Sequence, residues 1–211
     1  MLSERLPSLV VVSGPSGAGK STILARVLEE MRNLRFSVSH TTRAAREGET
    51  EGVHYHFVDR PTFEGMRERK LFLESAGVHG QLYGTSRVEY DRASADGVDL
   101  LLDLDVQGAA QVREAFPDAV SVFILPPSYT DLERRLRGRG AENEGNFHRR
   151  LQAAGEELLL YRQYAYAIIN DDLDRSVEHL KCIIRAARCR TSRVEPLAQK
   201  ILGTFPPSKE S

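Results

Sequence analysis

The chain has 211 residues, of which 41% are hydrophobic and 28% charged, and its formal net charge is −1. These values are typical of one soluble globular domain, and they give no excess of positive charge that would favour nucleic acid or an anionic membrane. Its apolar runs are short, its N-terminus has no cleavage pattern and its two cysteines cannot form a disulfide framework, so we expect a cytoplasmic protein outside the membrane.

The first predicted unit is a strand, a glycine-rich loop and a helix. Residues 9–13, with the sequence LVVVS, form a largely β-branched run, as in a buried parallel strand. From Lys20 the apolar side chains recur at helical spacing. Residues 36–92 then predict a small β-rich insertion. Within it, residues 36–42, 53–58, 71–74 and 88–90 favour short strands, and 61–70 favour a helix capped by Asp59 or Thr62.

Strands and helices alternate through the rest of the chain. We expect strands over residues 98–105, 120–125 and 167–170, and helices over 107–116, 129–136, 147–166 and 173–190. This order predicts an α/β fold with a parallel sheet flanked by helices, in a single domain that spans residues 1–211. We expect its core to cover about residues 8–35 and 93–190. We also expect the polar segment 138–146 to be mobile and the proline-containing tail, 196–211, to be partly disordered.

The strongest functional signal is the loop after the first strand. Its sequence, Gly14-Pro15-Ser16-Gly17-Ala18-Gly19-Lys20-Ser21, fits G-x-x-x-x-G-K-[ST] at every position, and Thr22 follows. Glycines let backbone N–H groups converge on a phosphate, and the start of a helix adds partial positive charge. Lys20 would bridge the β- and γ-phosphates and Ser21 would offer its hydroxyl to Mg²⁺. The motif therefore predicts a P-loop that binds a nucleoside triphosphate.

Two carboxylates follow the second buried strand. Asp103 or Asp105 would suit Mg²⁺ held through water, although residues in this position also cap the next helix. Asp105 and Gly108 also match D-x-x-G, which raises the alternative of a GTP-hydrolysing switch. Such switches carry N-K-x-D as well, and none of the five lysines here follows an asparagine, so we set that alternative aside.

Over about residues 8–190 the chain resembles the guanylate kinases. The segments that carry the resemblance, in the family's order, begin at Ser13 (SGPSGAGKST), Ser37 (SVSHTTR), Arg46 (REGE), Val53 (VHYHF), Phe72 (FLE), Leu82 (LYGT), Leu102 (LDLDVQG), Leu125 (LPPS), Arg137 (RGRG) and Ile169 (INDD). The resemblance implies transfer of the γ-phosphoryl group of MgATP to GMP, and to dGMP, in purine nucleotide metabolism. It also implies a P-loop NTPase-type sheet, a GMP-binding insertion over residues 36–92 and a helical lid over 137–150.

The resemblance also assigns roles on the GMP side. The residues that would hold the GMP phosphate are Arg43, Arg46, Tyr55 and Tyr83, and those near guanine are Glu74, Ser39, Thr85 and Asp105. Two guanidinium groups and two phenols are apt donors for phosphate oxygens, and one carboxylate can accept both N1–H and the N2 amine of guanine. How Asp103 and Asp105 divide metal and base contacts stays open.

On the ATP side the resemblance points to arginines of the lid. Arg139 and Arg150, with Lys20 and Arg43, would neutralise charge on the transferred group, and Asn170 would lie near adenine. Arg135, Arg137 and Arg149 lie close by and could replace either arginine. The chain departs from the family pattern at His40, and also at Ala44 and Ala45, which predict a looser loop before Arg46.

Two other functions are compatible with parts of the sequence. A P-loop kinase with a different acceptor would share the donor site and differ only around Glu74 and Ser39. A peptide-binding module of the same fold typically lacks the P-loop glycines or lysine, and both are intact here. The sequence does not indicate an oligomeric state.

Overall fold

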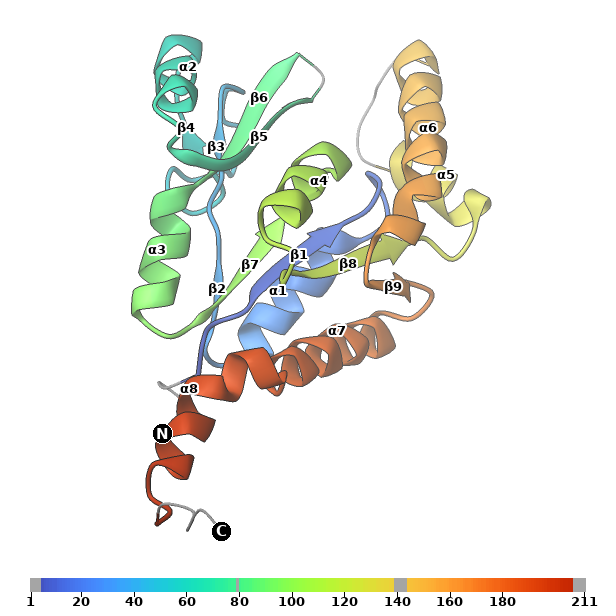
Figure 1. Cartoon of the computed structure of the whole chain (residues 1–211). Coiled ribbons are helices and arrows are strands. Elements are labelled where there is room, and N and C mark those ends of the chain that lie inside the picture. The colour runs from blue at the N-terminus through green and yellow to red at the C-terminus, as the bar shows by residue number, and fades with distance from the viewer. Residues whose placement is uncertain (1–4, 79, 139–143, 207–211) are drawn as a thin grey trace.

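The computed structural model describes residues 5–78, 80–138 and 144–206, which form two sheets with helices around them (Figure 1). The first part of the chain gives β1 (Leu9–Ser13), α1 (Lys20–Glu30), β2 (Leu34–Phe36), β3 (His40–Thr41), β4 (His56–Phe57), α2 (Arg60–Glu68), β5 (Phe72–Val78), β6 (Gln81–Ser86) and α3 (Arg87–Ala95). The rest gives β7 (Asp99–Asp103), α4 (Val106–Ala115), β8 (Val120–Leu125), α5 (Tyr129–Arg137), α6 (Glu144–Leu158), the 3₁₀ helix η1 (Leu159–Gln163), β9 (Tyr166–Ile169), α7 (Leu173–Arg188) and α8 (Thr191–Leu202).

The larger sheet is parallel, with strand order β2-β7-β1-β8-β9, so β1 lies in the middle. Successive side chains of a strand face opposite sides of the sheet. Val10 and Val12 therefore pack with α1 and α7, whereas Leu9 and Val11 pack with α3 and α4. The predicted α/β fold is confirmed, and the loop after β1 emerges between two neighbouring strand ends.

The smaller sheet has the order β4-β3-β6-β5, and all four strands lie within residues 36–92. The prediction of a strand over residues 88–90 is wrong, because these residues belong to α3. The Ser86 hydroxyl caps that helix by accepting from the Val88 N–H at 3.2 Å. Tyr90 and Ala93, three residues apart, then face the central sheet. The limits of this insertion, about 36 and 92, stay a prediction.

Helices α5 and α6 pack against each other beside the P-loop. Leu132 and Leu136 of α5 share a core cluster with Phe147 and Leu151 of α6, and the Arg137 guanidinium lies 4.0 Å from the centre of the Phe147 ring. We predicted one helix over residues 147–166, but the α-helical part ends at Leu158 and a 3₁₀ turn follows. Of the predicted lid, residues 139–143 lie outside the described part of the chain.

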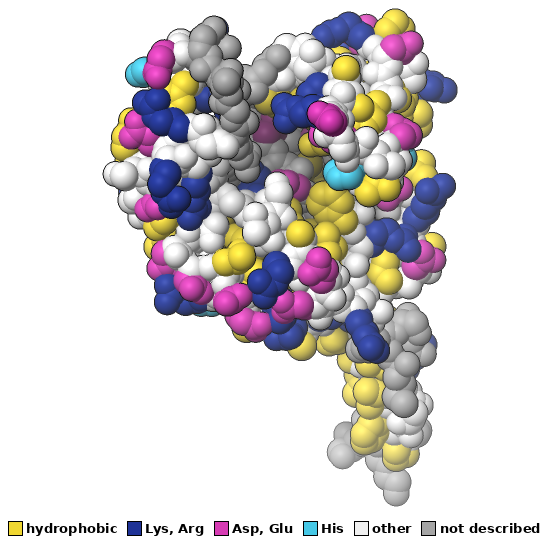
Figure 2. All heavy atoms as spheres, turned by 180° about the vertical axis from the view of Figure 1, so that it is seen from behind, with side chains coloured by type: hydrophobic (Ala, Val, Ile, Leu, Met, Phe, Trp, Pro, Cys, Tyr) yellow, Lys and Arg dark blue, Asp and Glu magenta, His cyan; other side chains and the backbone are white. Residues whose placement is uncertain are grey.

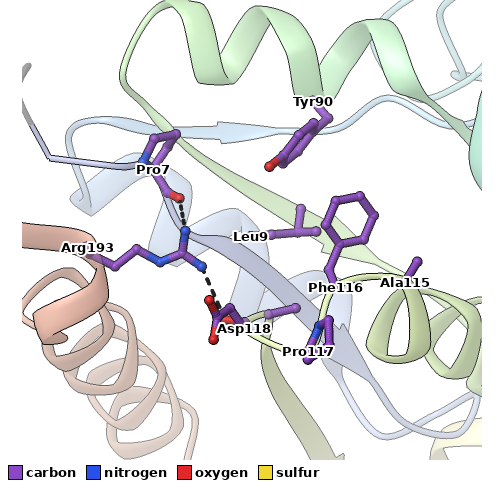
Figure 3. A pocket seen from close by; sticks show the side chains of 9 residues that line it. Pro7, Leu9, Tyr90, Ala115, Phe116, Pro117, Asp118 and Arg193 are labelled. Atoms are coloured by element: carbon purple, nitrogen blue, oxygen red, sulfur yellow. Dashed lines mark hydrogen bonds between the residues drawn. The ribbon is translucent and has the colours of Figure 1, made fainter. Parts of the chain in front are cut away.

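We expected a partly disordered tail over residues 196–211, but its first part is helical, because α8 continues through Pro196 to Leu202. Residues 207–211 lie outside the described part of the chain. The first turn of α8 is anchored by Arg193, which donates to the Pro7 carbonyl at 2.9 Å and the Asp118 carbonyl at 3.2 Å (Figure 3). These residues line a pocket of about 360 Å³ at the start of β1, remote from the P-loop. Figure 2 shows apolar side chains along the projecting helix.

A buried ion network closes the same end of the central sheet. Asp99 is fully buried, and its carboxylate accepts from both terminal nitrogens of Arg5 at 2.7 and 2.8 Å and from Arg188 Nε at 2.7 Å. The Ser8 N–H donates to the same carboxylate at 2.7 Å. The charge is therefore compensated by several donors, and the network joins the segment before β1 to the end of α7.

Candidate active site

The P-loop backbone requires its glycines. Gly14, Gly17 and Gly19 have φ angles of 142°, 88° and 96°, which side chains disfavour. A Cβ on Gly14 would lie 2.4 Å from the Ile124 carbonyl oxygen, and one on Gly19 would lie 2.2 Å from the Asn170 amide nitrogen. The loop is thus fitted closely to β8 and to the residue after β9, and it leads directly into α1.

Lys20 folds back over this loop. Its ammonium donates to the Gly14 carbonyl at 2.6 Å and lies 3.9 Å from a carboxylate oxygen of Asp103. Asp103 ends β7 beside Val12 of β1 in the parallel register, and Ser21 is exposed in the first turn of α1. A cation and a carboxylate therefore share the space above the loop.

Asp105 has a different position from Asp103. Its carboxylate accepts from the Gly108 N–H at 2.7 Å and forms the N-cap of α4. The helix-capping alternative that we considered for the two carboxylates therefore holds for Asp105. Asp103 remains the better candidate for the metal, because its side chain lies beside the P-loop lysine.

Two further side chains hold the loop from behind. The Asn170 amide donates to the Ala18 carbonyl at 2.8 Å and accepts from the Ser176 hydroxyl at 3.2 Å. The Arg135 guanidinium donates to the carbonyls of Ala18 and Asn170, at 3.2 Å in each case. Asn170 is buried and shapes the P-loop directly. Of the arginines that the sequence left open, Arg135 is one that contacts the loop.

Arg43, Tyr55 and Tyr83 lie together in the insertion. The Arg43 guanidinium is 5.4 Å from the centre of the Tyr55 ring, whose centre is 5.9 Å from that of Tyr83. Burial raises the pKa of the Tyr55 phenol above its ordinary value. A phenol is a hydrogen-bond donor at neutral pH. Arg46 lies near the same loop and its side chain is exposed. This cluster can offer several donors to one anion.

Glu49, which we did not predict, organises this cluster. Its carboxylate accepts from the Arg43 guanidinium at 2.8 Å and from the Arg46 N–H at 2.7 Å. The bond from Arg43 and then that from the Arg46 N–H hold the pKa of the Glu49 carboxyl at about 2. Glu49 ends the REGE segment that carries the family resemblance, but neither that motif nor its spacing from the two arginines indicates a contact.

Glu74, Ser39 and Thr85 meet where β5, β6 and the residue before β3 come together. Glu74 is 4% exposed, and one of its carboxylate oxygens accepts from the Thr85 N–H at 2.9 Å. The hydroxyls of Ser39 and Thr85 are 3.3 Å apart. Burial raises the pKa of the Glu74 carboxyl to about 7, against the hydrogen bonds from Thr85 and with a further contribution from the Asp105 carboxylate.

The lid side brings one predicted arginine to the P-loop. Arg150 donates to the Ser16 hydroxyl at 3.2 Å. Arg137 instead pairs with Glu133 and Glu144, and Arg139 lies outside the described residues. The sequence analysis also did not predict that Glu157, seven residues after Arg150 on the same helix, lies close enough to Lys20 to interact with its charge. Burial raises the pKa of its carboxyl, whereas the Lys20 ammonium lowers it.

Comparisons with known proteins show the family and the fold. A family model described as guanylate kinase matches residues 7–187. A guanylate kinase of Salmonella paratyphi A is 50% identical over 188 residues, which is 88% of this chain and 91% of that one. Another, of Neisseria meningitidis serogroup A, is 46% identical over 193 residues, covering 92% and 94%. The crystal structure of guanylate kinase from Anaplasma phagocytophilum matches with a TM-score of 0.82 at 33% identity, over 99% of this chain and 100% of that one.

Proposed function

Because the chain belongs to the guanylate kinase family and transfers a phosphoryl group from ATP to GMP, we propose that the residues described above divide this reaction into three tasks. The P-loop amides and Lys20 hold the β- and γ-phosphates of ATP, as their convergence at the start of α1 supports. Arg150 and Arg139 neutralise charge on the transferred group. Asn170 and Arg135 support ATP binding by holding the Ala18 carbonyl.

The acceptor is bound at both of its ends. Arg43, Arg46, Tyr55 and Tyr83 bind the GMP phosphate, and Glu74, with Ser39, Thr85 and Asp105 around it, binds guanine. The observation that carries this assignment is the buried Glu74 carboxylate, held by Thr85 on one oxygen. An ionised carboxylate accepts N1–H and the N2 amine of guanine together, whereas adenine presents no such pair of donors.

The chemistry follows from positioning and charge. The GMP phosphate is already an anion near neutral pH, so the attacking oxygen needs no general base. What the protein must supply is an in-line approach and compensation for the negative charge of two phosphate groups. The cations on the two sides of the site, Lys20 with Arg150 and Arg43 with Arg46, supply that compensation.

Mg²⁺ is the cofactor that we propose for the donor side. The Ser21 hydroxyl and the Asp103 carboxylate are the oxygen donors that this ion prefers, and both lie at the P-loop. Ser21 would bind the ion directly and Asp103 through water. When bound, Mg²⁺ neutralises charge on the β- and γ-phosphates.

The partners we propose are free ATP and GMP in the cytoplasm. In the parts of the chain that the structure describes, no helix is both long and apolar enough to span a membrane. On the face seen in Figure 2, basic and acidic side chains are interspersed, in keeping with the net charge of −1. A panel of nucleoside monophosphates assayed for ADP release tests the acceptor site, because the assignment of Glu74 to guanine requires GMP to be the best acceptor.

The titration of Glu74 gives a pH prediction. The carboxylate must be ionised to accept two N–H groups, and its pKa in the free protein is about 7. We expect KM for GMP to be constant at pH 8 and above, and to rise as pH falls below about 7, by up to tenfold per pH unit. Steady-state kinetics from pH 5.5 to 9 at saturating ATP would measure this.

The GMP phosphate itself titrates near pH 6, so the control is Glu74→Gln, in which only the phosphate effect remains. The rise near pH 7 should be absent in this variant. Equal pH profiles for the two proteins would contradict the assignment of Glu74.

A second prediction concerns Glu49. In Glu49→Gln the charge that orients Arg43 is lost, although an amide oxygen remains. We expect KM for GMP to rise by about 3- to 10-fold with KM for ATP unchanged, since a charge-assisted bond is weakened. The matched control is Glu51→Gln in the same segment, whose carboxylate bonds to His56 and the Phe57 N–H instead. If Glu49→Gln lowered KM for GMP, Glu49 would be a competitor of the phosphate and not its organiser.

A further inference from the structure

We propose that Gly108 and Gln111, on one face of α4, position the Glu74 carboxylate and thereby determine the preference for guanine. This inference rests on the proposed role of Glu74 in binding the base. It gives the D-x-x-G segment, which ends at Gly108, a role in acceptor recognition. Neither residue touches the reacting phosphates in this assignment, so both are positioning residues.

Position 108 requires a glycine because the Glu74 carboxylate lies against it. Its backbone conformation does not require one. It lies in the first turn of α4, where an alanine would adopt the same helical conformation. A Cβ added there would lie 2.5 Å from Oε2 of Glu74 and 3.1 Å from its carboxyl carbon. Real contacts of a Cβ are longer than this, so any side chain at position 108 must displace the carboxylate.

The carboxylate cannot move without losing another contact. Its second oxygen, Oε1, accepts from the Thr85 N–H at 2.9 Å, and the side chain is almost fully buried. The Glu74 carboxylate is thus confined between Gly108 on one side and Thr85 on the other. A displacement that relieves the contact with position 108 must change where the two oxygens face the base.

Gln111 fixes the backbone of the same strand one residue further on. Its side-chain oxygen accepts from the Ser75 N–H at 3.1 Å, and its amide nitrogen donates to the Ser75 carbonyl at 2.9 Å. The side chain therefore occupies the place of a neighbouring strand for β5. Gly108 and Gln111 are three residues apart, so they lie on the same side of α4.

Helix α4 is itself part of the central core. Ala109 and Val112 are fully buried against the second face of the large sheet. The guanine-binding carboxylate belongs to the small sheet. Because α4 packs on the large sheet, its contacts fix this carboxylate relative to the P-loop. The two substrates are thereby held in one frame, which an in-line transfer requires.

The test is Gly108→Ala, assayed with GMP and with inosine 5′-monophosphate, which lacks the N2 amine. We expect KM for GMP to rise by about 10- to 100-fold and the preference for GMP over the inosine nucleotide to fall, as one bond to a charged group is lost. KM for ATP should not change. The melting temperature should not fall, because alanine favours a helix more than glycine does. The control is Gly65→Ala in α2, where an added Cβ meets nothing within 4 Å.

A rescue variant separates positioning from general damage. Glu74→Asp shortens the side chain by one methylene and leaves room beside an alanine at position 108. We expect this substitution to cost less activity with GMP in the Gly108→Ala background than in the natural protein, so that the two changes are not additive. Additive losses would overturn the proposal, as would unchanged KM and preference in Gly108→Ala alone.

Gln111→Ala provides the second arm and keeps the proposal testable if Gly108→Ala does not fold. It should raise KM for GMP by about 3- to 10-fold and leave KM for ATP unchanged, and unchanged KM for GMP would count against the proposal. Glu74→Gln, measured in parallel, reports on the proposed function itself. If that variant keeps its guanine preference, the role of Glu74 fails. If it loses the preference while Gly108→Ala and Gln111→Ala do not, only the positioning role fails.

Discussion

Lys20→Ala should reduce phosphoryl transfer from ATP to GMP by about 10³-fold or more and leave the fold unchanged. The ammonium lies 2.6 Å from the Gly14 carbonyl, over the loop that we assign to the β- and γ-phosphates. Its removal takes away a charge-assisted donor to these phosphates, and such donors contribute most in the transition state. The assay is ADP release at saturating ATP and GMP, with thermal unfolding to verify the fold.

A lysine remote from the loop makes the control for this experiment. Lys200 lies on the exposed side of α8, so Lys200→Ala should retain full turnover. Turnover by Lys20→Ala within a few-fold of the natural protein would remove the P-loop lysine from the mechanism.

Glu74→Gln should remove most of the preference for GMP. A primary amide has one acceptor oxygen and presents N–H groups where the second guanine hydrogen points, so at least one bond to a charged acceptor is lost. The loss from the paired carboxylate contact amounts to several kcal/mol, and the preference over AMP, which we expect to be on the order of 10⁴, should fall by about 10²-fold or more. Competition kinetics with GMP and AMP as acceptors would measure it.

The same variant should gain stability at high pH. A carboxyl whose pKa is raised on folding, here to about 7, binds its proton more tightly in the folded state. Ionising this carboxyl therefore destabilises the folded state. The destabilisation is absent below the pKa of the unfolded chain and reaches its full value above pH 7. At pH 8, the free energy of unfolding of Glu74→Gln should exceed that of the natural protein by up to about 3 kcal/mol, since one pKa unit corresponds to about 1.4 kcal/mol. Lower stability at pH 8 would show that Glu74 is structural.

The sequence predicted the elements whose signal is local. The β-branched run before the P-loop, the glycines at its turns and the helical spacing from Lys20 each determine their own structure, and β1 and α1 were found within a residue. Val88 and Tyr90 alternate like a strand, but the Ser86 cap and the packing of Ala93 on the central sheet make them helical. Tertiary packing decided that segment, and its pattern alone could not.

For the site, residue types were predictable and their partners were not. Family motifs point to Arg43, Glu74 and Asn170 as site residues. That Arg43 is paired with Glu49, and that Asn170 holds the Ala18 carbonyl, follow from contacts between segments far apart or from loop geometry. Gly108 in α4 and Glu74 in β5 are in contact although they lie 34 positions apart in the chain. No periodicity in the sequence encodes such a contact.

The buried Asp99 network indicates where this enzyme can be labelled or attached to a surface. Arg5 and Arg188 converge on one carboxylate, so the chain before β1 and the end of α7 are tied together at the base of the sheet. Figure 1 shows that α8 and the segment that leads into β1 lie at the opposite side of the molecule from the P-loop. An affinity tag, a fluorescent label or a surface tether attached at either end should leave nucleotide access unobstructed.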